Sequence, residues 1–172
     1  MRLTCVVLGI AVGLAAALGL LAALEMGAAE SVSAAPSADI RYVYREGGVD
    51  AGDCSDAQNP CRTVQYAVSQ AASGSVIQVA DGDVSPAVYT GPFAITRSLT
   101  LQGGWHVDES FGFLRWCRIS PCEAERVVLT VRGTDRVISI TGAISPVIDC
   151  FTILGGDAAG LGGDPGGTVE ND

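Results

Sequence analysis

Four aspartates are the residues of this chain that could carry acid–base chemistry. Asp81 and Asp83 lie in a predicted turn, Asp149 is adjacent to a predicted strand, and Asp157 follows a pair of glycines. General acid–base catalysis needs two groups that converge and whose pKa values differ. Aspartates in turns commonly bond to the local backbone instead. These four residues could fall on neighbouring turns of a repeat, but nothing in their spacing makes them converge, so we assign no catalytic residue and expect no enzyme.

The sequence offers little for a metal or a cofactor. His106 is the only histidine, and a single histidine beside a tryptophan is more often a surface or packing residue. No two cysteines have the C-x-x-C spacing of a zinc site. Gly103-Gly104 follows a predicted strand, but no helix comes after it to bind a phosphate. The acids of the tail lack the spacing of calcium-binding repeats, so we predict no metal and no cofactor. These acids are Asp157, Asp164, Glu170 and Asp172.

The charge balance excludes one class of partner. The chain has 19 acidic and 10 basic residues, which gives a formal net charge of −9. No basic stripe is present to meet the phosphates of a nucleic acid, so we predict no nucleic-acid partner. The acidic residues are scattered along the chain, which is typical of a solvated surface.

The N-terminus is typical of a targeting segment. Arg2 precedes an uncharged run from Leu3 to Leu24, and Val32-Ser33-Ala34 fits a cleavage site, with Gly27-Ala28-Ala29 as a second candidate. The run is also long enough to span a bilayer as a helix. Residues 1–34 are therefore interpreted as a cleaved signal peptide or as a retained membrane anchor. Both alternatives place the rest of the chain outside the cytoplasm.

Export permits disulfides among the cysteines that follow this segment. The simplest connectivity closes two short loops, Cys54–Cys61 and Cys117–Cys122. Cys150 then has no partner. Because both loops are short, each bridge is expected to add no more than about 2–3 kcal/mol.

The secondary-structure pattern changes from helix to strand near the middle of the chain. Val64, Ala67, Val68 and Ala71 form one apolar stripe, which predicts a helix within residues 61–72 that ends at Ser73-Gly74. Alternating apolar residues then predict parallel strands near 76–80, 98–102, 127–131, 137–141 and 150–154. A helix that covers the first of several short stacked strands is typical of the protected end of a solenoid.

An internal repeat supports the solenoid interpretation. Leu99-Thr-Leu-Gln-Gly-Gly and Phe151-Thr-Ile-Leu-Gly-Gly share one pattern, and the glycine pairs would form the corners between strands. Alternation predicts which side chains point inward and which point outward. The inward set is Ile77, Val79, Leu99, Leu101, Val127, Leu129, Val131, Ile138, Ile140, Phe151 and Ile153, and the outward set is Gln78, Thr100, Ser139 and Thr152.

Two segments depart from the repeat. Residues 105–125 are rich in aromatic residues and form either a binding excursion or a cover for the side of the solenoid. The cover would use Trp105, Phe111, Phe113 and Trp116. Residues 157–172 are rich in glycine and acids, and we expect them to be disordered and unable to cap the last apolar layer.

These features carry a family resemblance. The stretches PCRTVQYAVSQAASGSVIQVADG, ITRSLTLQGGW and ISPVIDCFTILGGDAAGLGG resemble the start of secreted bacterial right-handed parallel β-helix proteins of the pectin-lyase-like superfold, over residues 41–163. The resemblance implies an all-β solenoid with an N-terminal capping helix, preceded by a hydrophobic signal or anchor helix. Proteins of this kind run on into further turns, so the chain resembles an N-terminal fragment. Enzymes of this superfold use carboxylates with calcium or an arginine base, but the fold alone does not imply an activity.

The domain plan and the function follow from these expectations. Residues 1–34 are the signal or anchor, 35–60 a linker and entry loop, 61–156 the first turns of the β-helix with its cap, and 157–172 the tail. We predict a non-enzymatic module of a cell-surface or secreted protein with a structural or adhesive role. Its partner would be a carbohydrate or a cell-surface component. The alternatives are a remnant of a polysaccharide lyase or glycoside hydrolase and a membrane-anchored surface protein.

Overall fold

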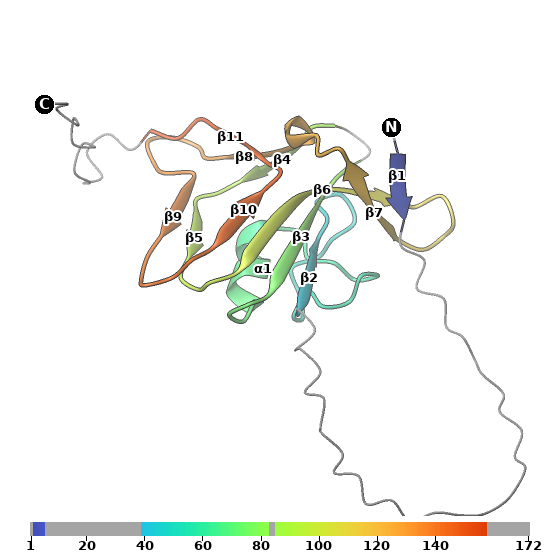
Figure 1. Cartoon of the computed structure of the whole chain (residues 1–172), viewed down its shortest axis with the longest axis horizontal. Helices are drawn as coiled ribbons and strands as arrows, with labels where there is room; N and C mark the ends of the chain where they lie inside the picture. Colours follow the sequence, from blue (N-terminus) through green and yellow to red (C-terminus); the bar gives the residue numbers. More distant parts are fainter. Residues whose placement is uncertain (1, 6–38, 83–84, 158–172) are drawn as a thin grey trace, which may run out of the picture.

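The described part of the protein consists mostly of β-strands and contains one short α-helix. The computed structural model describes residues 2–5, 39–82 and 85–157 (Figure 1). The first six elements are β1 (Arg2–Cys5), β2 (Ile40–Val43), α1 (Val64–Gln70), β3 (Val76–Asp81), β4 (Ala87–Thr90) and β5 (Phe93–Ile95). Those that follow are β6 (Thr100–Asp108), β7 (Arg115–Ser120), the 3₁₀ turn η1 (Ala124–Arg126), β8 (Val127–Thr130), β9 (Ile138–Ile140), β10 (Val147–Asp149) and β11 (Thr152–Leu154). The predicted helix and the five predicted strand regions are all present.

The strands form three sheets in which most neighbours are parallel. In sheet A, β2 pairs with β3, β3 with β6 and β6 with β10, all in parallel. Sheet B contains the parallel strands β4, β8 and β11, and sheet C contains β5 and β9. The chain visits the sheets in the order A, B, C, first through β3, β4 and β5 and then through β6, β8 and β9. In Figure 1, β2, β3, β6 and β10 follow one another across the molecule.

Side chains in register on neighbouring strands contribute to the core. Ile77, Leu101 and Ile148 lie opposite one another on β3, β6 and β10, and Ile77 and Leu101 are completely buried. The inward prediction is correct for the first seven residues of its set, from Ile77 to Val131. It is wrong for Ile140 and Ile153, each 49% exposed, because no described strand lies beyond the last layer. Gln78, predicted to point outward, is only 8% exposed.

Helix α1 is short but well bounded. The Thr63 hydroxyl accepts a hydrogen bond from the Tyr66 amide at 3.3 Å, which caps the first turn. Val64, Ala67 and Val68 are buried, as their spacing predicts. The Arg97 guanidinium donates to the carbonyls of the last turn, at 3.1 Å from the Ala71 oxygen. The helix packs on β2, β3 and β5 and so covers one side of the core.

Strand β6 continues past the glycine pair that was predicted to end it. Gly104 has a φ of +69°, and a Cβ there would lie 2.6 Å from the Cys150 sulfur. A Cβ on Gly103 would lie 2.1 Å from the Cys150 carbonyl oxygen. The two glycines therefore form an irregularity within the strand, opposite the register shift between Gln78 and Ala80, and not a corner between strands. Beyond it, β6 and β7 form an antiparallel hairpin that the sequence did not reveal.

The two ends of the chain are described only in part. Residues 2–5, expected to begin a hydrophobic helix, instead form β1, which pairs antiparallel with β7. The rest of the predicted signal or anchor, residues 6–38, lies outside the described residues, as do Asp83 and the tail residues 158–172. Among the residues that are described, no helix is long and apolar enough to cross a membrane.

The disulfides differ from the predicted pairing at one bridge. Cys54 and Cys61 are joined as predicted, with their Cα atoms 5.2 Å apart. Cys122 is bonded to Cys150 and not to Cys117, with a Cα separation of 6.0 Å. Cys117 is itself disulfide-bonded. Because β7 is extended as far as Ser120, it carries Cys117 away from Cys122, and closeness in sequence does not become closeness in space.

Candidate functional site

A buried aspartate, a histidine and an arginine meet where β3 ends. Asp81 is the last residue of β3, His106 lies opposite it on β6, and Arg126 ends the turn η1. The His106 Nδ1 atom lies 2.8 Å from Asp81 Oδ1. The Arg126 Nε and Nη2 atoms both contact Asp81 Oδ2, and Arg126 Nη1 lies 3.5 Å from Glu123 Oε2. We call these four residues the Asp81 cluster.

The cluster places a charge in the interior and compensates it. The Asp81 side chain is completely inaccessible to solvent, whereas those of His106 and Arg126 are 27% and 23% exposed. A buried carboxylate is strongly unfavourable unless it is paired and hydrogen-bonded. Here one carboxylate oxygen faces the imidazole and the other faces the guanidinium. The cluster therefore links β3, β6 and η1, three segments that are far apart in the sequence.

The contact between Asp81 and His106 also has the geometry of an acid–base pair. An aspartate at Nδ1 fixes the tautomer of a histidine and leaves Nε2 able to accept a proton, as in acid–base catalysis. Within the described part of the chain, no hydrogen-bond partner is present at His106 Nε2. The imidazole is partly exposed, so a solvent molecule or a substrate can reach it.

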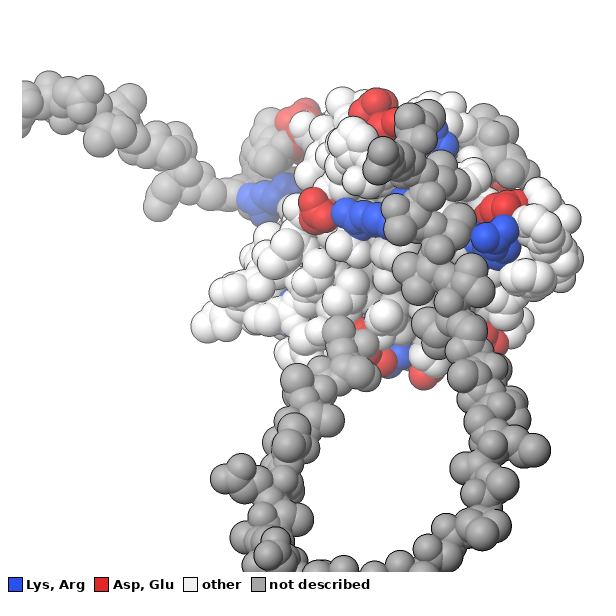
Figure 2. All heavy atoms as spheres, turned by 45° about the vertical axis from the view of Figure 1, so that its right-hand side comes forward, with Lys and Arg blue, Asp and Glu red and all other residues white. Residues whose placement is uncertain are grey.

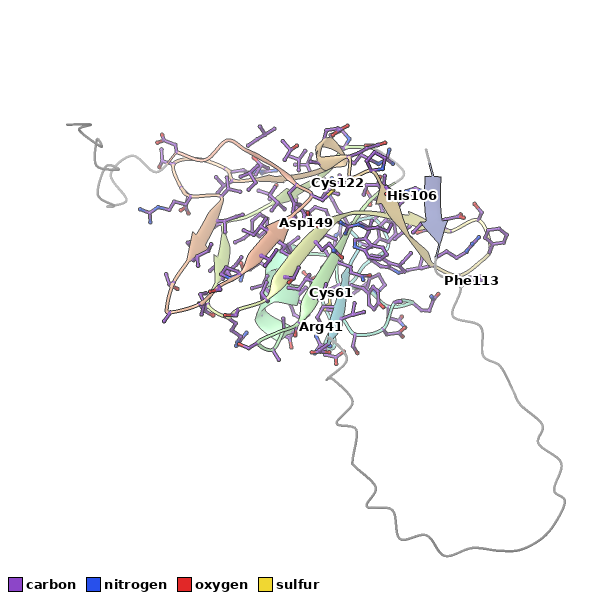
Figure 3. The ribbon with its side chains drawn as sticks, in the orientation of Figure 1. Arg41, Cys61, His106, Phe113, Cys122 and Asp149 are labelled. Atoms are coloured by element: carbon purple, nitrogen blue, oxygen red, sulfur yellow. A yellow bond between two sulfur atoms is a disulfide. The ribbon has the colours of Figure 1, made fainter. Side chains whose placement is uncertain are left out.

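The three candidate aspartates that the structure describes have different partners and do not form one site. Asp81 belongs to the buried cluster, whereas Asp149 forms an ion pair with Arg118 at 2.9 Å and is 48% exposed. Figure 3 shows Asp149 and His106 well apart on the molecule. The Asp157 amide bonds to the Asp135 carbonyl at 2.9 Å, and Asp83 lies outside the described residues. In the described ranges, no group of three or more His, Cys, Asp or Glu residues is arranged to hold a metal ion.

Sequence reasoning missed three members of the Asp81 cluster. The sequence pattern favours a packing or surface role for His106 and singles out neither Glu123 nor Arg126. No local sequence pattern predicts the contact between Asp81 and His106, because the two residues face each other only after the register shift between β3 and β6. The one available signal is Glu123 three residues before Arg126, a spacing at which opposite charges meet on a helical turn.

The aromatic segment divides into a packed base and an exposed end. Trp105 and Trp116 pack around the buried residues Tyr44, Ala80 and Val107, so the predicted cover is correct for the two tryptophans. Trp116 also donates its indole N–H to the Ala57 carbonyl at 2.9 Å, and its ring centroid lies 4.9 Å from that of Tyr42. These contacts fix the base of the β6–β7 hairpin to the body of the protein.

The exposed end carries two phenylalanines, which we call the aromatic tip. Phe111 and Phe113 are 60% and 53% exposed, and their ring centroids are 6.2 Å apart. The Arg115 guanidinium lies 4.9 Å from the Phe111 ring centroid. Figure 3 places Phe113 at the outer end of the hairpin. For these two rings the prediction of a cover is wrong, because more than half of each side chain is exposed.

The charges on the surface are mixed. On the face drawn in Figure 2, acidic and arginine side chains lie close to one another in small groups, separated by uncharged surface. Such a face lacks the continuous basic stripe that nucleic acids require.

Comparisons with known proteins assign no family and no function to the chain. No family model matches the chain, and no curated protein and no solved structure is significantly similar to it. The Asp81 cluster and the aromatic tip are therefore the features on which a function can be proposed.

Proposed function

We propose that this chain is an exported, non-enzymatic module of the right-handed parallel β-helix type, with an adhesive role at a cell surface or in a secreted protein. The repeated visit to sheets A, B and C in parallel register supports the β-helix. The disulfides support an oxidising compartment outside the cytoplasm. Residues 1–34 would direct export as a signal peptide or a retained anchor, and the intact mass of the exported protein distinguishes the two.

The aromatic tip is the observation that carries the adhesive role. Large apolar side chains exposed side by side on a protruding hairpin commonly mark an interaction site. The rings are held out from a rigid base, because Trp105 and Trp116 are packed and the Asp81 cluster ties β6 to β3. A flat ring can stack on the apolar face of a sugar, so the partner would be a carbohydrate or another cell-surface component.

A binding measurement with matched variants tests this proposal. The full exported chain is applied to immobilised polysaccharides and to whole cells, together with the double variant F111S/F113S. Removal of two central aromatic contacts should weaken binding about tenfold or more. The control is V49S, since Val49 is 67% exposed but lies away from the hairpin in sequence. If the double variant binds as well as V49S, the tip has no adhesive role.

The second candidate is a polysaccharide-active enzyme of the same superfold, and the pair of His106 and Asp81 favours it. In that case His106 would act as the base and Asp81 would orient it. The test is turnover of acidic and neutral polysaccharides by the full chain and by H106Q. Activity that is lost in H106Q while the unfolding transition stays unchanged would favour the enzyme. Equal turnover by both proteins would exclude His106 as its base.

A further inference from the structure

A second feature, distant in sequence from the hairpin, is an open pocket of about 200 Å³. It lies between the start of α1, strand β4 and Arg45, which follows the end of β2. The floor is apolar, and Val64, Tyr89 and Phe93 are each less than 5% exposed. The remaining lining residues are Arg45, Arg62, Thr63, Val88 and Thr90. We call it the arginine pocket.

Both arginines of this pocket have unused donors. Within the described part of the chain, the guanidinium groups of Arg45 and Arg62 have no ion pair and no hydrogen bond. Most other arginines are engaged, including those that pair with aspartates. A free guanidinium binds a carboxylate well, because its planar donors match the two carboxylate oxygens.

No acidic side chain lines the pocket to neutralise the positive charge of its two arginines, although the chain carries 19 acidic residues. The Asp50 carboxylate is occupied by the amides of Arg62 and Thr63 at 2.9 Å and by the Thr63 hydroxyl at 2.8 Å. The Glu46 carboxylate lies against the backbone of Gly82. The pocket therefore combines two cationic groups with an apolar floor.

We propose that the arginine pocket binds a small organic carboxylate with an apolar body. Arg45 and Arg62 hold the carboxylate, the Thr90 hydroxyl offers a further donor, and the partly exposed Val88 contacts the apolar part. A cavity of about 150 Å³ accommodates a benzene ring, so a single ring with a carboxylate suits the volume here. This site goes beyond the adhesive role and does not depend on it.

Benzoate is a suitable probe because it unites these two features. The full exported chain is titrated with benzoate while its backbone amides are followed by NMR. We expect saturable binding with shifts at Val64, Val88 and Thr90. Benzamide has the same ring without the charge and should bind about tenfold more weakly, since it cannot form charge-assisted hydrogen bonds. Added salt should weaken the binding of benzoate but not that of benzamide.

Variants locate the site. R45Q and R62Q should each reduce the affinity for benzoate about fivefold or more, as expected for the loss of a hydrogen bond to a charged group. The control is R132Q, which removes an exposed arginine outside the pocket and should leave the affinity unchanged. All three positions are exposed, and unchanged amide spectra without benzoate verify that each variant is folded. The proposal is overturned if R132Q weakens binding as much as R45Q, if benzamide or inorganic sulfate binds as well as benzoate, or if benzoate does not saturate at millimolar concentration.

Discussion

The Nδ1 atom of His106 lies 2.8 Å from the Oδ1 atom of Asp81, whose side chain is completely buried. This contact joins β3 to β6 immediately after the register shift between the two strands. The Arg126 guanidinium occupies the other carboxylate oxygen and brings η1 to the same point. The contacts of one buried side chain, Asp81, thereby join the segments on both sides of the aromatic hairpin.

Replacement of Asp81 should destabilise the protein strongly. D81N keeps the size of the side chain but leaves Arg126 with only the more distant Glu123 as an anionic partner. We expect a loss of about 2–4 kcal/mol in the free energy of unfolding, slightly below the usual value for a broken buried pair because the partners are partly exposed. The matched control is D149N, which breaks the exposed pair with Arg118 and should cost no more than about 1 kcal/mol. Equal losses in urea unfolding would show that the Asp81 cluster does not hold the fold.

Tyr89 should make the protein sensitive to alkali. Burial raises the pKa of Tyr89 well above its ordinary value of 10.0, and its hydroxyl donates to the Ala80 carbonyl at 2.8 Å. Because the folded pKa lies above the unfolded one, this contribution to stability is complete below pH 10 and falls as the pH rises beyond it.

Absorbance and unfolding measurements above pH 10 check this expectation. Tyr89 should ionise only as the protein unfolds, whereas Y89F should lose less stability on going from neutral to alkaline pH. At neutral pH, Y89F should cost about 1–2 kcal/mol, since the Ala80 carbonyl loses its donor. Y66F is the control variant. The Tyr66 hydroxyl also bonds to a backbone carbonyl, that of Gly52 at 3.0 Å, but Tyr66 is only half-buried. A Y89F protein with the same alkaline profile as the unmodified chain would refute the role of Tyr89.

The Cys122–Cys150 bridge should contribute more than the Cys54–Cys61 bridge. The two bridges span sequence separations of 28 and 7 residues. The loop-entropy relation gives about 3.6 and about 2.5 kcal/mol for closures of these lengths. C122A/C150A should therefore unfold at a lower urea concentration than C54A/C61A. Peptide mapping without reduction provides the control, and a Cys117–Cys122 fragment in it would contradict this pairing.

The last layer of strands should promote self-association. Four apolar residues are each about half exposed there: Ile140, Val147, Ile153 and Leu154. The strand edges beyond them have no described partner, and such edges readily pair with another chain. We expect concentration-dependent sedimentation of the chain, and less of it in I153T/L154T than in V49T. A monomer at all concentrations with a sharp thermal transition well above about 65 °C would contradict this expectation.

Much of the backbone could be predicted because its signals are local. The stripe of Val64, Ala67 and Val68 predicts α1, and the alternation around Ile77 and Leu101 predicts parallel strands with the correct residues inside. Such patterns depend only on the helical and strand periods.

The site could not be predicted because it depends on register. Asp81 meets His106 only as a result of the irregularity at Gly103-Gly104, and Cys122 meets Cys150 only when β11 returns to β8. A shift of one residue reverses which face a strand residue occupies, so these meetings cannot be read from spacing. The exposure of Phe111 and Phe113 likewise follows from the unpredicted hairpin.

The stacked parallel arrangement is the central claim, and inter-strand NOEs measure it most directly. On isotope-labelled full chain, we predict cross-strand contacts between Ile77 and Leu101 and between Leu101 and Ile148, in the staggered Hα–HN pattern of parallel strands. Contacts in the symmetric Hα–Hα pattern of antiparallel strands, or the absence of any contact between Leu101 and Ile148, would contradict the stack.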